Sequence, residues 1–317
     1  MEANRYKYLV KAVKLILFFL VVWFVIKNIS ANFDKIRDIE YNSYDPKYIF
    51  LSVITVFVSL IYPVFVWRYL LSSLGERINT LTAMRIWFVS NMGRYIPGKV
   101  LQIAGLVYLS AAEGIPKNKA VQSVFYSQLT ANVLGILMGS ALLFFKSGSN
   151  DYLNGYQITA VLLTVFLILL KMPAFFSGSV NFFLRKMGKQ TVGKELPAKN
   201  YLIYILLQTA NWFLMSFAFV LLANSYTSVK LWNDPQILFI LPISWTLGLL
   251  AFFAPGGIGV RESVMTYWLA DIMPVEFALV LPWVYRIIVT FSEVVLTVIF
   301  ISAYKKPEEI KDNTEQN

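Results

Sequence analysis

Long apolar runs constrain this chain more than any other feature of its sequence. Each run meets or approaches the ~20 mostly apolar residues that cross a hydrocarbon layer. The runs cover residues 13–26, 48–71, 121–145, 158–170, 201–223, 237–254 and 277–304. Charged residues make up only 15% of the sequence, whereas soluble domains hold about 25%. These runs predict an all-α polytopic membrane protein.

The sequence contains no cysteine and no histidine. Disulfides, thiolate nucleophiles, zinc sites and a histidine proton relay are therefore excluded, and we expect no metal and no cofactor. The formal net charge is +10, which on its own would be compatible with nucleic-acid binding. The positions of the lysines and arginines fit membrane topology instead, so we expect no nucleic-acid partner.

Basic residues cluster in segments that should face the cytoplasm. Arg5, Lys7 and Lys11 precede the first apolar run, which we interpret as an uncleaved helix because no small-residue cleavage site follows. Residues 171–199 carry six basic residues against Glu195 alone. We therefore expect both termini and residues 171–199 to be cytoplasmic. The chain divides into a transmembrane domain, residues 1–306, and a polar cytoplasmic tail, residues 307–317.

Two stretches interrupt the apolar pattern with proline and glycine: "NMGRYIPGKVLQIAG" at 91–105 and "FFAPGGIGVRESV" at 252–264. Proline and glycine should end one helix there and begin another. The flanking segments, 80–96 with 99–112 and 237–254 with 258–270, are short for spans. They predict two re-entrant hairpins that enter from opposite faces, beside about six spans. The alternative is that each pair of segments crosses the membrane twice. The loops before and after the pair would then lie on the same sides of the membrane as a hairpin would place them.

The two halves of the chain show a similar order of elements. In each, an apolar helix leads to a Pro-Gly break, a shorter helix with a charge near its start, and a following span. Their opposite orientations would make an inverted repeat, a plan common among secondary transporters. Independent use of a helix-breaking dipeptide is the competing explanation.

The residues beside the breaks suit an anion. A helix that starts at membrane depth points unpaired N–H groups into a cavity, where they favour phosphate. The candidate substrate-binding residues are Arg94, Lys99, Gln102, Arg261 and Arg286, and those that would shape the cavity are Pro97, Gly98, Pro255, Gly256, Gly257 and Gly259. The alternative is a pair of structural kinks with basic side chains that reach the membrane surface.

Charges within the last apolar run should face the interior of the bundle, because ionisable groups at that depth are costly. Arg286 and Glu293 are seven residues apart and share one helix face. We expect Glu293 to pair with Arg261 or Arg94. We expect Arg286 to pair with Glu262 or to meet the substrate. Glu262 and Glu293 would balance charge, and a purely structural ion pair is the alternative.

Two pairs of amides occur at helical spacing in the apolar runs. Gln128 and Asn132 are four residues apart, and Gln208 and Asn211 are three apart. We expect them to form hydrogen bonds between helices rather than to bind a ligand.

The segments "NMGRYIPGKV" and "APGGIGVRESV" resemble the lysylphosphatidylglycerol synthase transmembrane-region family, also called the flippase-like family. The resemblance extends from about Lys11 to Tyr304, and Lys99 stands where a small residue would be expected. It implies a bacterial-type inner (plasma) membrane protein with about eight membrane helices, some of them re-entrant, that moves a lipid or lipid-linked headgroup between leaflets. Members that make the lipid carry an additional cytoplasmic transferase domain, so we do not expect synthase activity here.

The function expected from the sequence is lipid translocation. No nucleotide-binding loop or catalytic carboxylate pair occurs at convincing spacing, so we expect no enzyme. The substrate would be an anionic phospholipid or lipid-linked headgroup, moved through a cationic cavity between the hairpins. The alternative is an accessory protein that presents lipid to a separate lipid-modifying transferase.

Overall fold

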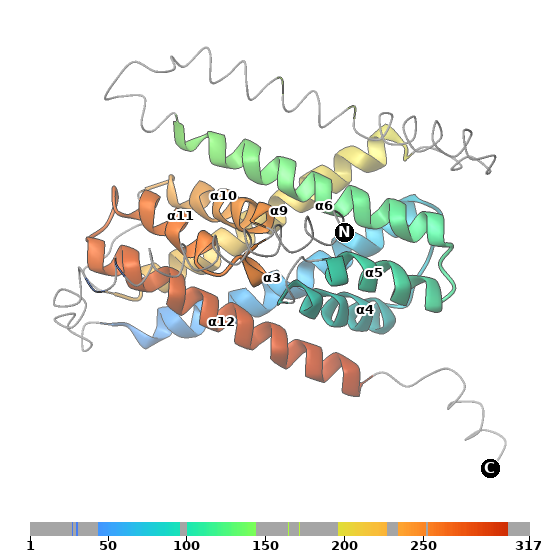
Figure 1. The fold of residues 1–317 in the computed structure, drawn as a ribbon, viewed down its shortest axis with the longest axis horizontal. Coiled ribbons are helices and arrows are strands. Elements are labelled where there is room, and N and C mark those ends of the chain that lie inside the picture. The colour runs from blue at the N-terminus through green and yellow to red at the C-terminus, as the bar shows by residue number, and fades with distance from the viewer. Residues whose placement is uncertain are drawn as a thin grey trace, which may run out of the picture.

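The structure is a computed structural model that describes residues 44–95, 100–143, 196–226, 234–251 and 253–303, with the single positions 27, 30, 164 and 171. These residues form eight α-helices and two short 3₁₀ turns (Figure 1). Their one described β interaction is an isolated bridge between Tyr44 and Tyr226. The expected all-α class is therefore confirmed for this part of the chain. The apolar runs at 13–26 and 158–170 lie outside these ranges, as do Pro97, Gly98, Lys99 and the tail.

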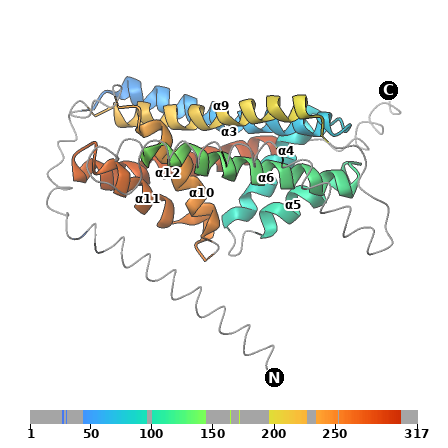
Figure 2. The same cartoon turned by 90° about the horizontal axis from the view of Figure 1, so that it is seen from above.

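Three helices are long and apolar enough to cross a membrane: α3 (Pro46–Ser73), α9 (Ala198–Ala223) and α12 (Val275–Ser302). At 26 to 28 residues each extends about 39–42 Å, more than the ~30 Å of a hydrocarbon layer. Helix α3 packs along α9 (Figure 2). The Ser52 hydroxyl on α3 donates to the Ala218 carbonyl on α9 at 2.7 Å.

Helix α6 (Lys117–Ser140) has 24 residues, which is a sufficient length for a span. Its composition does not place it among the candidate spans, because it carries Lys117 and Lys119 at its start and several amides and hydroxyls farther on. It packs against α10 (Ile237–Leu250) and α5 (Val100–Ala112). Three candidate spans are thus described where about six spans were expected.

Each Pro-Gly stretch joins two short helices that pack on each other. The first hairpin runs from α4 (Thr80–Met92) through the turn η1 (Gly93–Tyr95) to α5. The second runs from α10 through the turn η2 (Pro255–Gly257) to α11 (Val260–Leu269). These helices have 10 to 14 residues, or about 15–21 Å, less than one crossing requires.

The two hairpins extend toward opposite ends of the molecule and meet at their turns. Figures 1 and 2 both place α4 and α5 toward one end and α10 and α11 toward the other. The turns η1 and η2 contact each other, with the ring of Tyr95 against Gly256. The turns η1 and η2 therefore meet between the two hairpins, inside the bundle.

Glycine makes the second turn possible. Gly256, Gly257 and Gly259 have φ angles of 58°, 71° and 81°, values that other residues adopt only with strain. Helix α11 then begins, and the Glu262 side chain accepts a hydrogen bond from the Gly259 N–H at 2.7 Å. The chain thus reverses within a few residues and starts a new helix inside the protein.

The two site carboxylates face the interior and many large apolar side chains face outward, as a lipid environment requires. Glu262 and Glu293 are each 2% exposed. On α12 the side chains of Ile287, Phe291 and Val298 are exposed. This outward-facing apolar surface and the three long apolar helices are what a membrane-spanning bundle requires.

Candidate functional site

Helix α12 holds the first break through Glu293. Arg94 of η1 pairs its Nη1 with Glu293 Oε1 at 2.9 Å, and the Tyr95 hydroxyl donates to Glu293 Oε2 at 2.6 Å. Arg94 Nε also donates to the Asn91 carbonyl at 3.1 Å. Both carboxylate oxygens of Glu293 are therefore occupied by the turn that precedes Pro97. Of the two partners expected for Glu293, Arg94 is confirmed.

Seven residues earlier, the same helix holds the second break through Arg286. Its Nη1 donates to Glu262 Oε1 at 2.6 Å and its Nη2 donates to the Gly256 carbonyl at 3.1 Å. Since Glu262 Oε2 accepts from Gly259, this carboxylate is also occupied on both sides. The expected Arg286–Glu262 pair is confirmed. Both Nη atoms of Arg286 are engaged by the second turn and the start of α11.

Arg261 is buried differently from these two arginines. It is 9% exposed, and its guanidinium carbon lies 3.7 Å from the centre of the Trp245 ring, a close cation–π contact. Its Nε has no hydrogen-bond partner. Within the described part of the chain no carboxylate oxygen forms an ion pair with it.

Two glycines make room for the Arg261 side chain. A Cβ at Gly248 would overlap the Arg261 side chain, and a Cβ at Gly257 would lie 3.0 Å from its Nε. The second break and helix α10 are thus shaped around a guanidinium.

The charges of the described ionisable groups in this region do not cancel. Arg94, Arg261 and Arg286 supply three positive charges, and Glu262 and Glu293 supply two negative ones. With both carboxylates paired to other arginines, the excess charge belongs to Arg261. A buried unpaired charge is costly, so an arginine in this state favours a bound anion.

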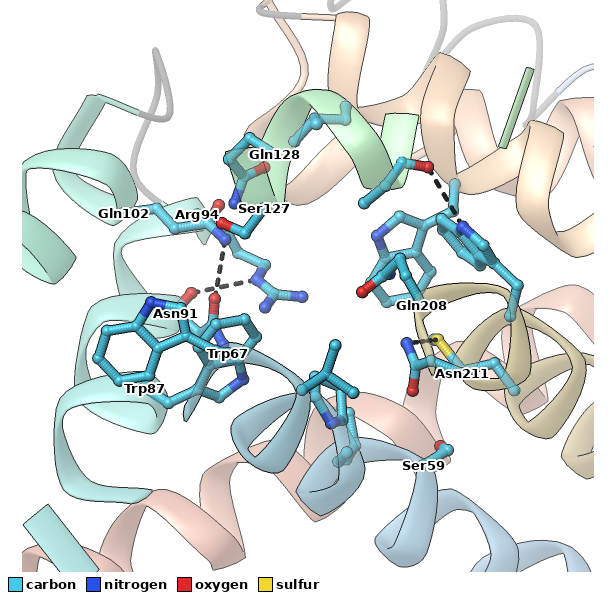
Figure 3. Close-up of a pocket in the computed structure, with 18 of the residues that line it drawn as sticks. Ser59, Trp67, Trp87, Asn91, Arg94, Gln102, Ser127, Gln128, Gln208 and Asn211 are labelled. Atoms are coloured by element: carbon cyan, nitrogen blue, oxygen red, sulfur yellow. Dashed lines mark hydrogen bonds between the residues drawn. The ribbon is translucent and has the colours of Figure 1, made fainter. Parts of the chain in front are cut away.

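Arg94, Arg261 and Glu293 border a cavity of about 120 Å³, large enough to hold several water molecules. Figure 3 shows Asn91, Arg94 and Gln102 on one side of it. The Gln102 amide donates to Asn91 Oδ1 at 2.8 Å. Gly256 also lines the cavity.

The other predicted residues have different places. Arg286 and Glu262 line a separate cavity of about 30 Å³, which Arg261 and Trp245 border as well. Pro255, Gly257 and Gly259 belong to the second turn and the start of α11. Lys99, Pro97 and Gly98 lie outside the described residues.

The amides on α6 and α9 contradict the expectation of hydrogen bonds between helices. Asn132 donates to the Gln128 carbonyl of its own helix at 2.6 Å, and Asn211 reaches the Met215 sulfur of its own helix at 4.0 Å. All four amides instead line the 120 Å³ cavity that Arg94 and Arg261 border. The spacing of these amides predicted that each pair shares one helix face. It could not predict whether that face meets a neighbouring helix or a cavity.

Sequence reasoning also missed the aromatic side chains of the site. Trp67, Trp87, Trp212 and Trp245 line the cavity, and Tyr95 binds Glu293. Tyrosine and tryptophan are common in membrane proteins, so their presence gave no signal. Asn91 was not among the candidate residues, although its position three residues before Arg94 could have suggested a role.

A comparison with curated proteins found no match. Residues 11–296 match the family described as the lysylphosphatidylglycerol synthase TM region, in agreement with the resemblance of the two Pro-Gly motifs. The match covers both hairpins, the candidate spans α3 and α9, α12 as far as Leu296, and every residue of the site. The chain therefore belongs to the family of the lysylphosphatidylglycerol synthase transmembrane region.

Proposed function

We propose that this protein moves an anionic phospholipid or lipid-linked headgroup across the bilayer, as a transporter and not as an enzyme. The headgroup passes through the cationic cavity between the two hairpins, and the acyl or isoprenoid tails stay in lipid. Membership of the family indicates a lipid-related role in the membrane. Movement between leaflets is the part that this proposal adds.

Arg261 is the observation that carries the proposal. It is a buried guanidinium with a vacant hydrogen-bond donor, at the edge of a cavity where the other described charges, Arg94 and Glu293, are paired with each other. A lipid phosphate supplies the missing negative charge. A static structural network would more economically pair every charge, as the Arg94–Glu293 and Arg286–Glu262 pairs do.

We also propose that the hairpins are re-entrant and enter from opposite faces of a bacterial-type inner membrane, with both termini cytoplasmic. The short arms of each hairpin, their opposite directions and the contact between the two turns support this arrangement. Gly98 and Gly257 would then lie near mid-depth. The non-helical backbone at Gly256 is buried within the protein, which is the condition for such backbone at membrane depth.

The test is reconstitution of the purified protein into liposomes that carry a trace of fluorescent phosphatidylglycerol. A membrane-impermeant reductant bleaches the outer leaflet, and label that becomes accessible later has crossed. We expect the wild-type protein to increase crossing over empty liposomes and Arg261→Met to abolish the increase. If the wild-type protein binds the lipid but does not move it, the accessory function is favoured instead. Mass spectrometry of the gently purified protein would identify the lipid that it retains.

A further inference from the structure

Three of the described α-helices contain an internal proline, and in two of them a neighbouring helix replaces the hydrogen bond that the proline removes. Proline has no N–H, so the carbonyl four residues earlier loses its helical partner. The Leu238 carbonyl, which Pro242 frees in α10, accepts from the Ser216 hydroxyl of α9 at 2.9 Å. The carbonyl that Pro282 frees in α12 accepts from the Thr266 hydroxyl of α11 at 2.9 Å. Both of these helices are therefore held at their prolines by a neighbour.

The third proline, Pro63 in α3, is not held in this way. It frees the Ser59 carbonyl, and no side chain of the described residues donates a hydrogen bond to this oxygen. The Ser59 hydroxyl donates to the Val56 carbonyl at 2.8 Å. Ser59 and Pro63 both line the 120 Å³ cavity, where water can hydrate a carbonyl that a proline has freed. A proline that no neighbouring helix holds is a point at which a helix can bend.

Before Pro63, α3 is attached to α9, which runs beside it (Figure 2). The Ser52 hydroxyl donates to the Ala218 carbonyl at 2.7 Å. At the start of the helix the Asp45 N–H donates to the Ser225 carbonyl at 2.6 Å. Helix α9 contains no proline, so it forms with the first half of α3 a unit that has no proline break.

After Pro63, α3 is attached to the first hairpin. The Arg68 Nε donates at 3.2 Å to the carbonyl of Ile78, which lies two residues before α4. The centres of the Trp67 ring and the Trp87 ring of α4 are 5.8 Å apart. The second half of α3 and the start of α4 therefore form a second unit.

A hydrogen bond to α6 holds this second unit in the conformation of the structure. The Trp67 indole N–H donates to the Ser123 hydroxyl at 3.2 Å, the long end of the usual range. Helix α6 is in turn attached to α9, because the Trp212 indole N–H donates to the Ala131 carbonyl at 3.2 Å. Bending at Pro63 would lengthen the bond between Trp67 and Ser123 and leave the bond between α6 and α9 intact.

We infer that α3 is a hinge at Pro63, and that its second half moves with the start of α4 relative to α9 while the tip of the first hairpin stays on α12. Figure 3 shows Trp67, Trp87 and Asn91 on one side of the cavity and Gln208 on the other. The movement therefore changes the width of the cavity. The bending itself does not depend on the proposed function, whereas its role in admitting lipid does.

The first test restores the missing hydrogen-bond donor. Pro63→Ala supplies an N–H to the Ser59 carbonyl, and bending would then have to break that bond. Since one net hydrogen bond changes an equilibrium by roughly a threefold to tenfold factor, we expect lipid crossing in liposomes to slow by about that factor. Pro242→Ala is the matched control, because the carbonyl it would serve already has a hydroxyl partner. Crossing that is unchanged in Pro63→Ala, or slowed equally in both variants, would overturn the role of the hinge in transport.

The second test measures the bend without transport. The chain has no cysteine, so spin labels at Leu202→Cys on α9 and Arg77→Cys before α4 report the distance between the two units. Both positions are exposed. In nanodiscs that contain phosphatidylglycerol we expect a broad or two-component distance distribution, which Pro63→Ala should narrow. Ser123→Ala, which removes the acceptor of the Trp67 N–H, should shift the distribution toward the bent form.

The two tests separate the hinge from the proposed function. A single narrow distance that neither Pro63→Ala nor Ser123→Ala changes would overturn the hinge. Bending in a wild-type protein that moves no lipid would leave the hinge in place and refute the proposed function.

Discussion

Arg261 and Arg94 lie near the same indole, Trp245, but they differ in their electrostatic partners. Arg94 is paired with Glu293, whereas Arg261 has no carboxylate partner among the described residues. Removing one partner of a buried pair leaves the other charge uncompensated, which costs about 3–5 kcal/mol. Removing an unpaired charge leaves nothing uncompensated.

We therefore predict opposite effects for two matched substitutions. Arg94→Met should lower the thermal unfolding temperature in detergent substantially, because Glu293 loses its counter-charge. Arg261→Met should maintain or raise that temperature, since methionine retains the apolar contact with Trp245, and it should abolish stabilisation by added phosphatidylglycerol. An Arg261→Met protein as unstable as Arg94→Met would show that Arg261 serves the fold rather than the lipid.

Gly248 gives a second prediction at this scale. A Cβ at this position would overlap the side chain of Arg261, so Gly248→Ala should displace the guanidinium from Trp245. We expect weaker stabilisation by phosphatidylglycerol in a thermal unfolding assay. Gly105→Ala is the control, because a Cβ there meets its nearest atom, in Ser90, at an ordinary 3.5 Å. Similar lipid responses in the two variants would contradict this role for Gly248.

At the scale of elements, α12 is the support that positions both breaks. It supplies Glu293 to the first turn and Arg286 to the second. Glu293→Leu alone should destabilise the protein by about 3–5 kcal/mol, and Arg94→Met together with Glu293→Leu should recover most of that loss. Translocation should not recover, because Arg94 also lines the cavity.

Thermal unfolding and liposome crossing, measured on the two single variants and the double variant, separate these effects. Gln122→Leu provides a reference for a buried polar residue outside the cavity. A double variant with wild-type stability and full transport would show that the Arg94–Glu293 pair only supports helix packing and has no role in transport.

The sequence predicted the ends of helices well where proline and glycine in the same stretch determine the backbone conformation. Pro255 with Gly256 and Gly257 ended one helix and started another, as their backbone preferences require. For a residue whose ion-pair partner is distant in sequence, the sequence could only reduce the possible partners to two alternatives. Arg94 and Arg261 were equally plausible for Glu293, because the choice depends on how three separate elements pack. Gly248 gave no signal, since its role follows from a side chain thirteen residues later.

At the scale of the whole molecule, the direction of the two hairpins is the feature most open to test. The loop before α4 and the loop after α11 lie at opposite ends of the bundle (Figures 1 and 2). The chain has no cysteine of its own, so single cysteines report their side of the membrane without interference.

We predict that an impermeant maleimide labels Ala270→Cys in intact cells and labels Arg77→Cys only after the membrane is opened. Both positions are exposed in the structure. Lys189→Cys should behave as Arg77→Cys does, because its segment is rich in basic residues. Labelling of positions 77 and 270 from the same side would contradict hairpins that enter from opposite faces, and with them the inverted repeat.

The attachment of both breaks to one helix has a consequence for the register of that helix. Arg286 and Glu293 are seven residues apart, which is two helical turns or about 10.5 Å along α12. Because each binds one hairpin turn, α12 fixes the distance between the two turns. One residue inserted between them would rotate Glu293 by about 100° away from Arg94. A seven-residue insertion would restore the direction but place the two contacts about 10.5 Å too far apart. The distance between the hairpin tips, and with it the width of the cavity they enclose, is therefore encoded as a residue count along α12.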